Sequence, residues 1–485
     1  MPFNKNNARQ LGKDIAAGTL SSRDVTQFYI DRIRKYNPSL NAIVAERFDS
    51  ALQDADKADK ARDAGNLLGP LHGVPMTLKD AFEVEGLTCD VGVPDYAGTV
   101  STKDSVVTQR LKAAGAIILG KTNTPFMCGD WQSFNDVHGT SHNPFHLEHT
   151  PGGSSGGAAA ALAAGLTPLE YGSDIGGSIR VPAHFCGLFG HKPTHGIIPT
   201  RGHVPPKHGV LSTGDLNVVG PLARSVGDLE LAFDLTVGPI MPASQGLQIA
   251  LQGPRFSRPE GLRIGLWVDD NYCPVDAEMA ANIEAAARTL EKLGASVVTI
   301  KPDFDLQLHT QAFVTLLSSV MGADFPEPVH ASLQKMIDAA DPKDTSLRLT
   351  QARGVRLMHK DWLYWNEVRA QMAQKWLELF EKVDVIFCPV TPTPAMPHTQ
   401  GADFHSRAFE VNGAPREYME NVVWPGVATL CGLPATIAPV QRHSSGLPMG
   451  VQIIGPAYED RTPMAVARML EENGHHFVAP EGYDD

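Results

Sequence analysis

The chain has 485 residues and a formal net charge of −13, an acidic balance that excludes the basic face a nucleic-acid-binding protein needs. No segment approaches 18 consecutive apolar residues, so we expect no membrane span. The opening residues MPFNKNNARQ lack a signal-peptide core and the six cysteines show no CxxC spacing, which together favour a cytoplasmic protein with reduced thiols over a secreted or disulfide-bonded one.

The predicted elements alternate between helices and short apolar strands. Two helices are expected in the first forty residues, and Ser21 followed by Asp24 is typical of the capping box that begins the second helix. Three stretches are predicted to run from the end of a helix into a short apolar strand: 110–123, 290–300 and 375–389. A further strand is predicted at 262–268. This alternation predicts an α/β protein with helices packed around a buried, mixed β-sheet.

Residues 303–370 differ from this pattern. They are helical in tendency, and the polar stretch 341–346 interrupts them. We interpret them as a helical insertion over the sheet. The sequence leaves open whether this insertion helps to line a substrate entrance or is only a structural cap.

The stretch GGSSGG (152–157) carries glycine and serine only. It is not a phosphate-binding P-loop, because no Gly-Lys-Ser/Thr follows. It matches G-x-S-x-G around Ser154 and Ser155, but the nucleophile elbow of an α/β-hydrolase needs a strand just before the serine, and HNPFHLEHTP is a poor strand. By itself the loop could also be glycine-rich only to let chain segments pass closely.

A second loop, GSDIGGS (172–178), follows about twenty residues later. Its glycines allow consecutive backbone amides to turn toward one point, as an oxyanion hole requires. The predicted donors are the amides at the end of this loop: Ile175, Gly176, Gly177 and Ser178. Ser178 would place its hydroxyl beside this hole and is therefore the candidate nucleophile.

A serine nucleophile needs a base. His184 and His191 lie in a stretch that reads as packed core. Lys79 follows the apolar run 74–78, which predicts a buried strand, and a lysine there must be paired or neutral. The alternative to a catalytic base is a structural ion pair with Asp80 or another acidic residue.

Four histidines have near-helical spacing that could suggest a metal face: His138, His142, His146 and His149. Gly139 and the Asn143–Pro144 pair interrupt any helix in this stretch. We therefore expect no metal site here.

Four stretches together resemble the amidase signature family of serine hydrolases: GPLHGVPMTLKD, TPGGSSGG, GSDIGGSIRVPAHFCGLFGHKPT and GLPMGVQIIGP. The resemblance covers nearly the whole chain. It implies a single domain, 1–485, with a large mixed β-sheet covered by helices on both faces. It also implies a Ser–cis-Ser–Lys triad in which Ser178 is the nucleophile, Ser154 the bridging serine after a cis peptide, and Lys79 the base.

The same resemblance implies further roles. The segment 122–135 lies beside the acyl site in the family, so Met127, Cys128, Gly129 and Trp131 become candidate substrate-wall residues. Asp174 and Arg180 flank the nucleophile loop, and we expect them to brace it instead of taking part in the chemistry.

The predicted function is hydrolysis of the C–N bond of small neutral amides, and also of esters or carbamates, without a cofactor, by a monomer or homodimer. One alternative is the glutaminase subunit of a tRNA-dependent amidotransferase. Such subunits typically carry Thr where this chain has Ile175, which disfavours that reading. A second alternative is a non-catalytic binding module on the same fold. It would be expected to lack one of Lys79, Ser154 or Ser178, and all three are present.

Overall fold

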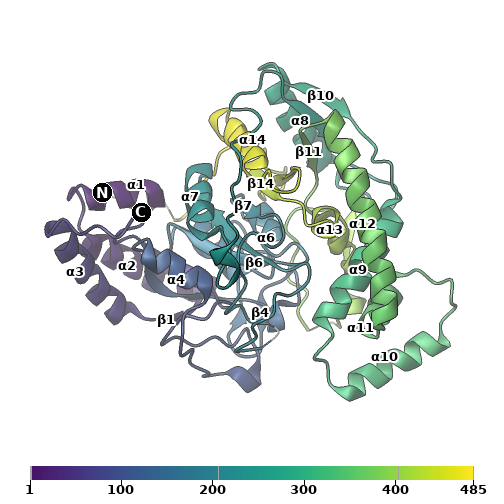
Figure 1. Ribbon diagram of the computed structural model, residues 1–485, viewed down its shortest axis with the longest axis horizontal. Helices are drawn as coiled ribbons and strands as arrows, with labels where there is room; N and C mark the ends of the chain where they lie inside the picture. Colours follow the sequence, from purple (N-terminus) through teal and green to yellow (C-terminus); the bar gives the residue numbers. More distant parts are fainter. Residues whose placement is uncertain (1–2, 206, 402, 484–485) are drawn as a thin grey trace.

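The computed structural model describes residues 3–205, 207–401 and 403–483. A mixed eight-stranded sheet forms its centre, with strand order β10-β9-β11-β15-β14-β7-β8-β6 (Figure 1). β9 pairs in parallel with β10 and β11, and the other neighbours are antiparallel. The bounds, in sheet order, are Ser296–Thr299, Arg263–Leu266, Val385–Cys388, Gly450–Ile454, Ala435–Pro439, Phe189–Lys192, Val218–Ala223 and Glu170–Asp174. The predicted α/β class and mixed sheet are confirmed.

A smaller three-stranded sheet has the order β1-β3-β2, with β1 at Ile43–Glu46, β3 at Ile117–Thr122 and β2 at Pro75–Lys79. β2 is parallel to β3 and packs beside β6, the edge strand of the large sheet. The predicted buried strand before Lys79 is thus confirmed, and Pro75 begins it, where a missing N–H is tolerated. Two short hairpins complete the strands: β4 (Phe134–Asn135) with β5 (Gly139–Thr140), and β12 (Ala408–Val411) with β13 (Ala414–Glu417).

Helices cover the sheets (Figure 1). Their bounds, from α1 to α14, are Ala8–Ala16, Ser22–Leu40, Phe48–Asp63, Val106–Ala113, Gly156–Ala163, Arg180–Phe185, Val226–Thr236, Ala277–Glu291, Leu306–Met321, Glu327–Ala339, Leu347–Val355, His359–Lys382, Val423–Thr429 and Arg461–Glu472. The predicted cap is confirmed, because the Ser21 side chain accepts from the Asp24 N–H at 3.3 Å. Asp276 caps α8 in the same way.

α5 lies at the centre of the molecule, in contact with β2 and β6, and every residue of it is buried. Its sequence, GGAAAALA, suits this position because small side chains let backbones on several sides approach closely. A Cβ on Gly157 would stand 2.4 Å from the Asn123 nitrogen. The packing of α5 therefore fixes Ser154 and Ser155, which directly precede it.

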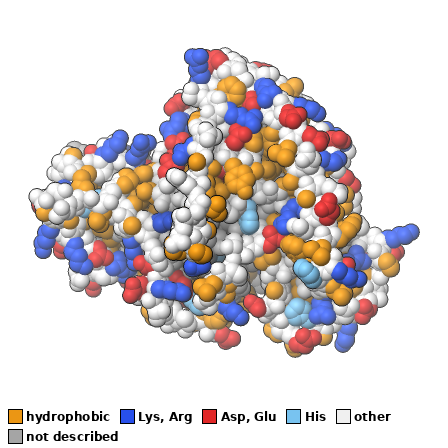
Figure 2. Space-filling view, in the orientation of Figure 1, with side chains coloured by type: hydrophobic (Ala, Val, Ile, Leu, Met, Phe, Trp, Pro, Cys, Tyr) orange, Lys and Arg blue, Asp and Glu red, His pale blue; other side chains and the backbone are white. Residues whose placement is uncertain are grey.

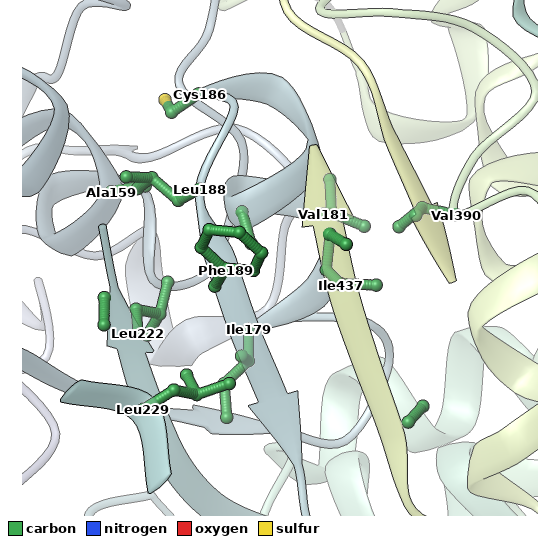
Figure 3. Close-up of a cluster of buried hydrophobic side chains, with 14 of the residues drawn as sticks. Ala159, Ile179, Val181, Cys186, Leu188, Phe189, Leu222, Leu229, Val390 and Ile437 are labelled. Carbon is green, nitrogen blue, oxygen red and sulfur yellow. The ribbon is translucent and has the colours of Figure 1, made fainter. Parts of the chain in front are cut away.

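α6 is anchored just after Ser178 by apolar side chains (Figure 3). Ile179 and Val181 are fully buried in the main core, together with Phe189 on β7 and Ile437 on β14. Burying such side chains stabilises the fold by roughly 1.5–3 kcal/mol each. The end of the second Gly/Ser loop is therefore held by the core of the large sheet.

The segment 303–370 is helical, comprising α9, α10, α11 and the first half of α12, and 341–346 is the break between α10 and α11. α9 packs against α11, α12 and α13 and is buried, whereas α10 has no buried residue and lies at the outer edge (Figure 1). On the face shown in Figure 2, acidic and basic side chains are interspersed around apolar areas. Among the described residues, no helix combines the length and apolarity needed to cross a membrane.

Candidate active site

Lys79 and Ser154 are in contact in the interior. Lys79 Nζ donates to Ser154 Oγ at 2.6 Å and to Ser173 Oγ at 3.0 Å. Lys79 is fully buried at the end of β2, Ser154 belongs to the first Gly/Ser loop, and Ser173 lies on β6. The lysine nitrogen at the end of β2 thus meets two hydroxyls supplied by two other parts of the chain.

The environment of Lys79 favours the neutral amine. Burial lowers the pKa of Lys79 below its ordinary value of 10.5. The Cys128 thiol, Asp174 and Glu170 oppose that shift without reversing it. A neutral lysine can accept a proton, which a base must do.

The ion pair between Lys79 and Asp80, weighed as the alternative role, does not form in this structure. Asp80 pairs with Lys121 instead, at 3.0 Å between Oδ1 and Nζ, with both side chains buried. The two histidines near the second loop also form hydrogen bonds with residues outside this loop. His184 contacts Thr393 and Gly450, and His191 contacts Thr436 and Asp460.

The peptide bond between Gly153 and Ser154 is cis, as the resemblance implied. A Cβ at Gly153 would stand 2.4 Å from the carbonyl oxygen of Asp130, so only glycine fits here. Ser155 is fully buried and donates to the Ser173 carbonyl. The strand that a nucleophile elbow requires does not precede it among the described residues 141–153.

Asp174 and Arg180 form a fully buried ion pair at 2.8 Å. Asp174 also accepts the N–H groups of Gly177 at 2.9 Å and Ile179 at 3.0 Å. Burial by itself raises the pKa of Asp174, but the neighbouring Arg180 guanidinium outweighs this effect and lowers that pKa to about 2. The expected bracing role matches these contacts, since the pair holds both ends of the turn that presents Ser178.

This bracing corrects one of the predicted oxyanion donors. The Gly177 N–H is already engaged by Asp174, so it is not free for a substrate oxygen. Within 3–205, 207–401 and 403–483, no atom accepts from the amides of Ile175, Gly176 or Ser178. Gly177 has a φ of +104°, which other residues rarely adopt, and it serves the shape of the turn.

Trp131 contacts the nucleophile loop directly. Its Nε1–H donates to the Gly176 carbonyl at 2.9 Å, and its ring packs on Phe404 and Tyr418. The indole thereby orients the peptide that carries the Gly177 nitrogen. The contact shows that Trp131 supports this loop, and its predicted place in the substrate wall stays a prediction.

Met127, Cys128 and Gly129 lie in or directly after a short turn near Lys79. Met127 and Cys128 belong to a short turn, Phe126–Cys128, and are partly exposed. The Cys128 thiol is within interaction distance of Lys79 and Ser154. The turn therefore borders Lys79.

Helix α9 approaches both the second Gly/Ser loop and the turn Phe126–Cys128. Leu317 approaches to 3.9 Å of the position a Cβ would take on Gly176, and Met321 to 3.7 Å of that on Gly129. Both residues belong to the predicted insertion 303–370, but the sequence placed neither of them at the site, and it did not single out Ser173. Ser173 lies within the stretch GSDIGGS, near the end of β6. Its hydroxyl, next to Asp174 in the sequence, could have identified it as a candidate site residue. No local signal identified Leu317 or Met321.

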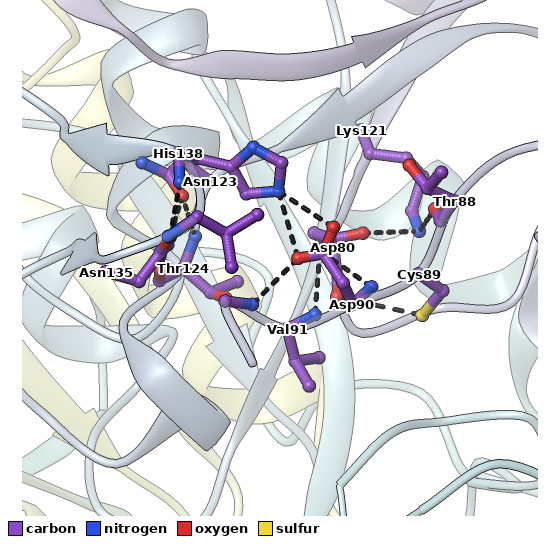
Figure 4. Close-up of polar contacts among 12 residues, drawn as sticks. Asp80, Thr88, Cys89, Asp90, Val91, Lys121, Asn123, Thr124, Asn135 and His138 are labelled. Carbon is purple, nitrogen blue, oxygen red and sulfur yellow. Dashed lines mark hydrogen bonds and ion pairs between the residues drawn. The ribbon is translucent and has the colours of Figure 1, made fainter. Parts of the chain in front are cut away.

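One group among the described residues could offer three ligands to a cation: Asp80, Asp90 and His138, whose ligand atoms lie within 4.8 Å of one another (Figure 4). Lys121 already supplies a positive charge to Asp80 at 3.0 Å. Of the four histidines weighed as a metal face, only His138 belongs to this group. The expectation that the enzyme needs no metal stays a prediction.

Comparison with known proteins gives the family. The family model described as Amidase matches residues 24–463. Fatty-acid amide hydrolase 2 of Homo sapiens is 31% identical over 97% of this chain and 89% of its own. A glutamyl-tRNA(Gln) amidotransferase subunit of Acinetobacter baumannii is 30% identical over 96% of this chain and 95% of its own. A bacterial aryl acylamidase of the amidase signature family has a similar structure, with TM-score 0.81, 24% identity and coverage of 98% and 97%.

The mixed sheet, the two Gly/Ser loops and the buried lysine define a hydrolase of the amidase signature class. The chain belongs to the Amidase family, whose members are amidohydrolases that act on C–N bonds.

Proposed function

We propose that the chain hydrolyses the C–N bond of small neutral amides through an acyl-enzyme on Ser178, with aryl amides, esters and carbamates as further substrates. The observation that carries this proposal is the 2.6 Å contact between Lys79 and Ser154 in a buried site. A base that is neutral and joined to a hydroxyl can activate a serine at the adjacent loop.

In the proposed acylation, Ser178 Oγ attacks the carbonyl carbon as its proton moves to Ser154, whose own proton moves to Lys79. The resulting oxyanion is stabilised by the amides of Ile175, Gly176 and Ser178. The C–N bond then breaks as the proton held by Lys79 returns through Ser154 to the leaving nitrogen. The products of this half-reaction are the free amine and the Ser178 ester.

Deacylation uses the same groups in reverse. Water attacks the Ser178 ester, and its proton passes through Ser154 to Lys79. The C–O bond to Ser178 breaks, and the proton returns to Ser178. The acid is released and the enzyme is restored with no net change in its protons and no cofactor.

The preference for a neutral substrate is supported by the apolar contacts of α9. Leu317 and Met321 reach toward Gly176 and Gly129. Phe126, three residues before Gly129, is 55% exposed. We accordingly propose that 303–370 is a helical insertion of a single domain, 1–485, and that it lines the entrance. Apolar walls favour an aryl or alkyl group next to the scissile bond.

The test is labelling with a fluorophosphonate probe followed by peptide mass spectrometry. Wild type and Ser155→Ala are expected to carry the probe on Ser178, and Ser178→Ala is expected to remain unlabelled and inactive on an anilide. A label on Ser155 in the wild type would contradict the proposal and revive the nucleophile-elbow reading.

The 30% identity to a subunit of a tRNA-dependent amidotransferase favours a second candidate, a glutaminase that works with partner proteins. Ile175 disfavours this second candidate, because such subunits typically carry Thr at the corresponding position. The two candidates differ in whether the isolated chain turns over a simple amide. A non-catalytic binding module is disfavoured by the presence and mutual proximity of Lys79 and Ser154.

A further inference from the structure

Four titratable side chains form a cluster beside the base, here called the Asp80–His138 cluster: Asp80, Asp90, Lys121 and His138 (Figure 4). Lys121 Nζ lies 3.0 Å from Asp80 Oδ1. His138 Nε2 lies 2.9 Å from both carboxylate oxygens of Asp90. Asp80 directly follows Lys79 in the chain, yet nothing in the proposed reaction uses these four residues.

The charges of the cluster balance when His138 is protonated, because two carboxylates then face one ammonium and one imidazolium. Burial opposes the charged ring, but the hydrogen bond and charge of Asp90, with the charge of Asp80, raise the pKa of His138. Burial also opposes the charge on Asp90, and the hydrogen bond from His138 lowers the pKa of that carboxyl. Each partner favours the ionised form of the other.

The acidic side of the cluster holds the turn that borders Lys79. Asp80 Oδ2 accepts the Val91 N–H at 2.9 Å. The Val91 carbonyl in turn accepts the Met127 N–H, also at 2.9 Å. Met127 and Cys128 have φ angles of 51° and 55°. Such angles cost a non-glycine residue of order 1 kcal/mol or more, so the turn persists only if its surroundings hold it.

The histidine side of the cluster holds the same turn from its other flank. Asn135 Oδ1 accepts the His138 N–H at 2.7 Å, and Asn135 Nδ2 donates to the Thr124 carbonyl at 2.7 Å. Thr124 lies two residues before Phe126, where the turn begins. The contact between Asp90 and His138 therefore joins the two segments that support Phe126–Cys128.

We propose that the Asp90–His138 ion pair is a positioning device for the turn Phe126–Cys128, and that His138 is a positioning residue of the amidase reaction. Protonated His138 keeps the turn closed against Lys79 and the substrate. The inference rests on the proposed function, since it concerns the substrate wall of the same site.

The sign of the pH dependence follows from the groups that face His138, namely Asp90, Asp80 and Lys121. The pKa of His138 is raised in the folded protein, so the ion pair is complete below the ordinary value of 6.5 and is lost as pH rises through the raised value. KM for an amide is therefore expected to increase across that interval. The kcat of the wild type instead rises with pH as Lys79 loses its proton.

The experiment compares four variants: His138→Gln, Asp90→Asn, the double variant, and His443→Gln as the matched control. His443 also pairs with a carboxylate, Glu278, at 3.2 Å, but lies outside the site. Each preparation is titrated with the fluorophosphonate probe, so kcat and KM for an anilide refer to folded, active enzyme from pH 6 to 9.

Each single variant is expected to raise KM about tenfold at pH 6 and to make KM independent of pH. The KM of the double variant is expected to be no higher than that of either single variant. His443→Gln is expected to behave as wild type. Unchanged KM in the folded fraction of the single variants, or additive losses in the double variant, would overturn the proposal.

The wild type provides an independent measurement if the variants do not fold. Its KM must rise with pH, and a flat KM overturns the proposal. If the wild type is labelled at Ser178 but its KM does not change with pH, the positioning role of His138 is contradicted and the proposed function is not. If the wild type is neither labelled nor active, the proposed function is contradicted, and with it the positioning role.

Discussion

Lys79 on β2 and Ser173 on β6 lie on different sheets and meet at 3.0 Å between Nζ and Oγ. This contact ties the base to the strand that leads into the nucleophile loop. Because Ser178 follows β6 by four residues, the distance between base and nucleophile depends on how the two sheets pack. The hydroxyl of Ser173 is thus a support for Lys79 that the triad alone does not include.

Ser173→Ala tests that support. We expect kcat/KM for an anilide to fall about tenfold, since a buried hydrogen bond to a charged or basic group contributes roughly 1.5 kcal/mol. Steady-state kinetics on probe-titrated enzyme gives the ratio. Ser101→Ala is the control, because Ser101 Oγ is buried and has no hydrogen-bond partner in the described part of the chain. Equal kinetics for Ser173→Ala and wild type would contradict the role.

Arg180→Ala is expected to lower the free energy of unfolding by about 3–5 kcal/mol, because it leaves the Asp174 carboxylate buried without its partner. Thermal or urea unfolding measures the loss. Arg288→Ala removes an exposed pair with Glu284 and is expected to change little. A small effect of Arg180→Ala would show that the pair does not brace the loop.

The same pair predicts an acid limit. The folded pKa of Asp174 is about 2 against an ordinary value of 3.8. A depressed folded pKa contributes stability above pH 3.8, and this stability is lost as pH falls from 3.8 toward 2. In Asp174→Asn, the free energy of unfolding should therefore depend less on pH in this interval. An unchanged slope would contradict the assignment.

Much of the fold and of the site could be predicted because the signals are local. The Ser21 cap, the strand ending at Lys79 and the two Gly/Ser loops are each set by a few neighbouring residues. Long-range contacts could not be predicted in this way. The engagement of the Gly177 amide by Asp174 and the approach of Leu317 to Gly176 depend on tertiary packing, which no local period encodes.

The absence of a metal requirement is a separate prediction. Turnover of an anilide is expected to survive prolonged EDTA treatment, because Lys121 already compensates Asp80 in the one three-ligand group among the described residues. Activity before and after chelation is compared. Loss of activity that zinc or manganese restores would mean that Asp80, Asp90 and His138 hold a required ion.

The purified chain is expected to hydrolyse a simple amide without tRNA, ATP or a second polypeptide. The reason is that the residues proposed as base, bridging serine and oxyanion donors all belong to this one chain. An anilide assay on the purified protein alone measures this. Turnover that appears only with partner proteins would place the amidotransferase reading first.

Lys79→Met tests the central claim, that Lys79 is the shared base and acid. Methionine fills a similar volume without a charge, so we expect the variant to fold. Amide cleavage should fall by several orders of magnitude, because the base and the proton for the leaving amine are lost together. Cleavage of an activated ester should fall much less, since its leaving group needs little protonation.

The most direct measurement is the ratio of anilide to p-nitrophenyl acetate turnover in wild type and Lys79→Met across the pH range. The pKa of Lys79 is lowered in the folded protein, so the wild-type amide rate should rise with pH through that lowered value and then level off. We expect this rise in wild type and a much lower amide-to-ester ratio in Lys79→Met. Equal losses on both substrates, or a wild-type amide rate that is flat with pH, would contradict it.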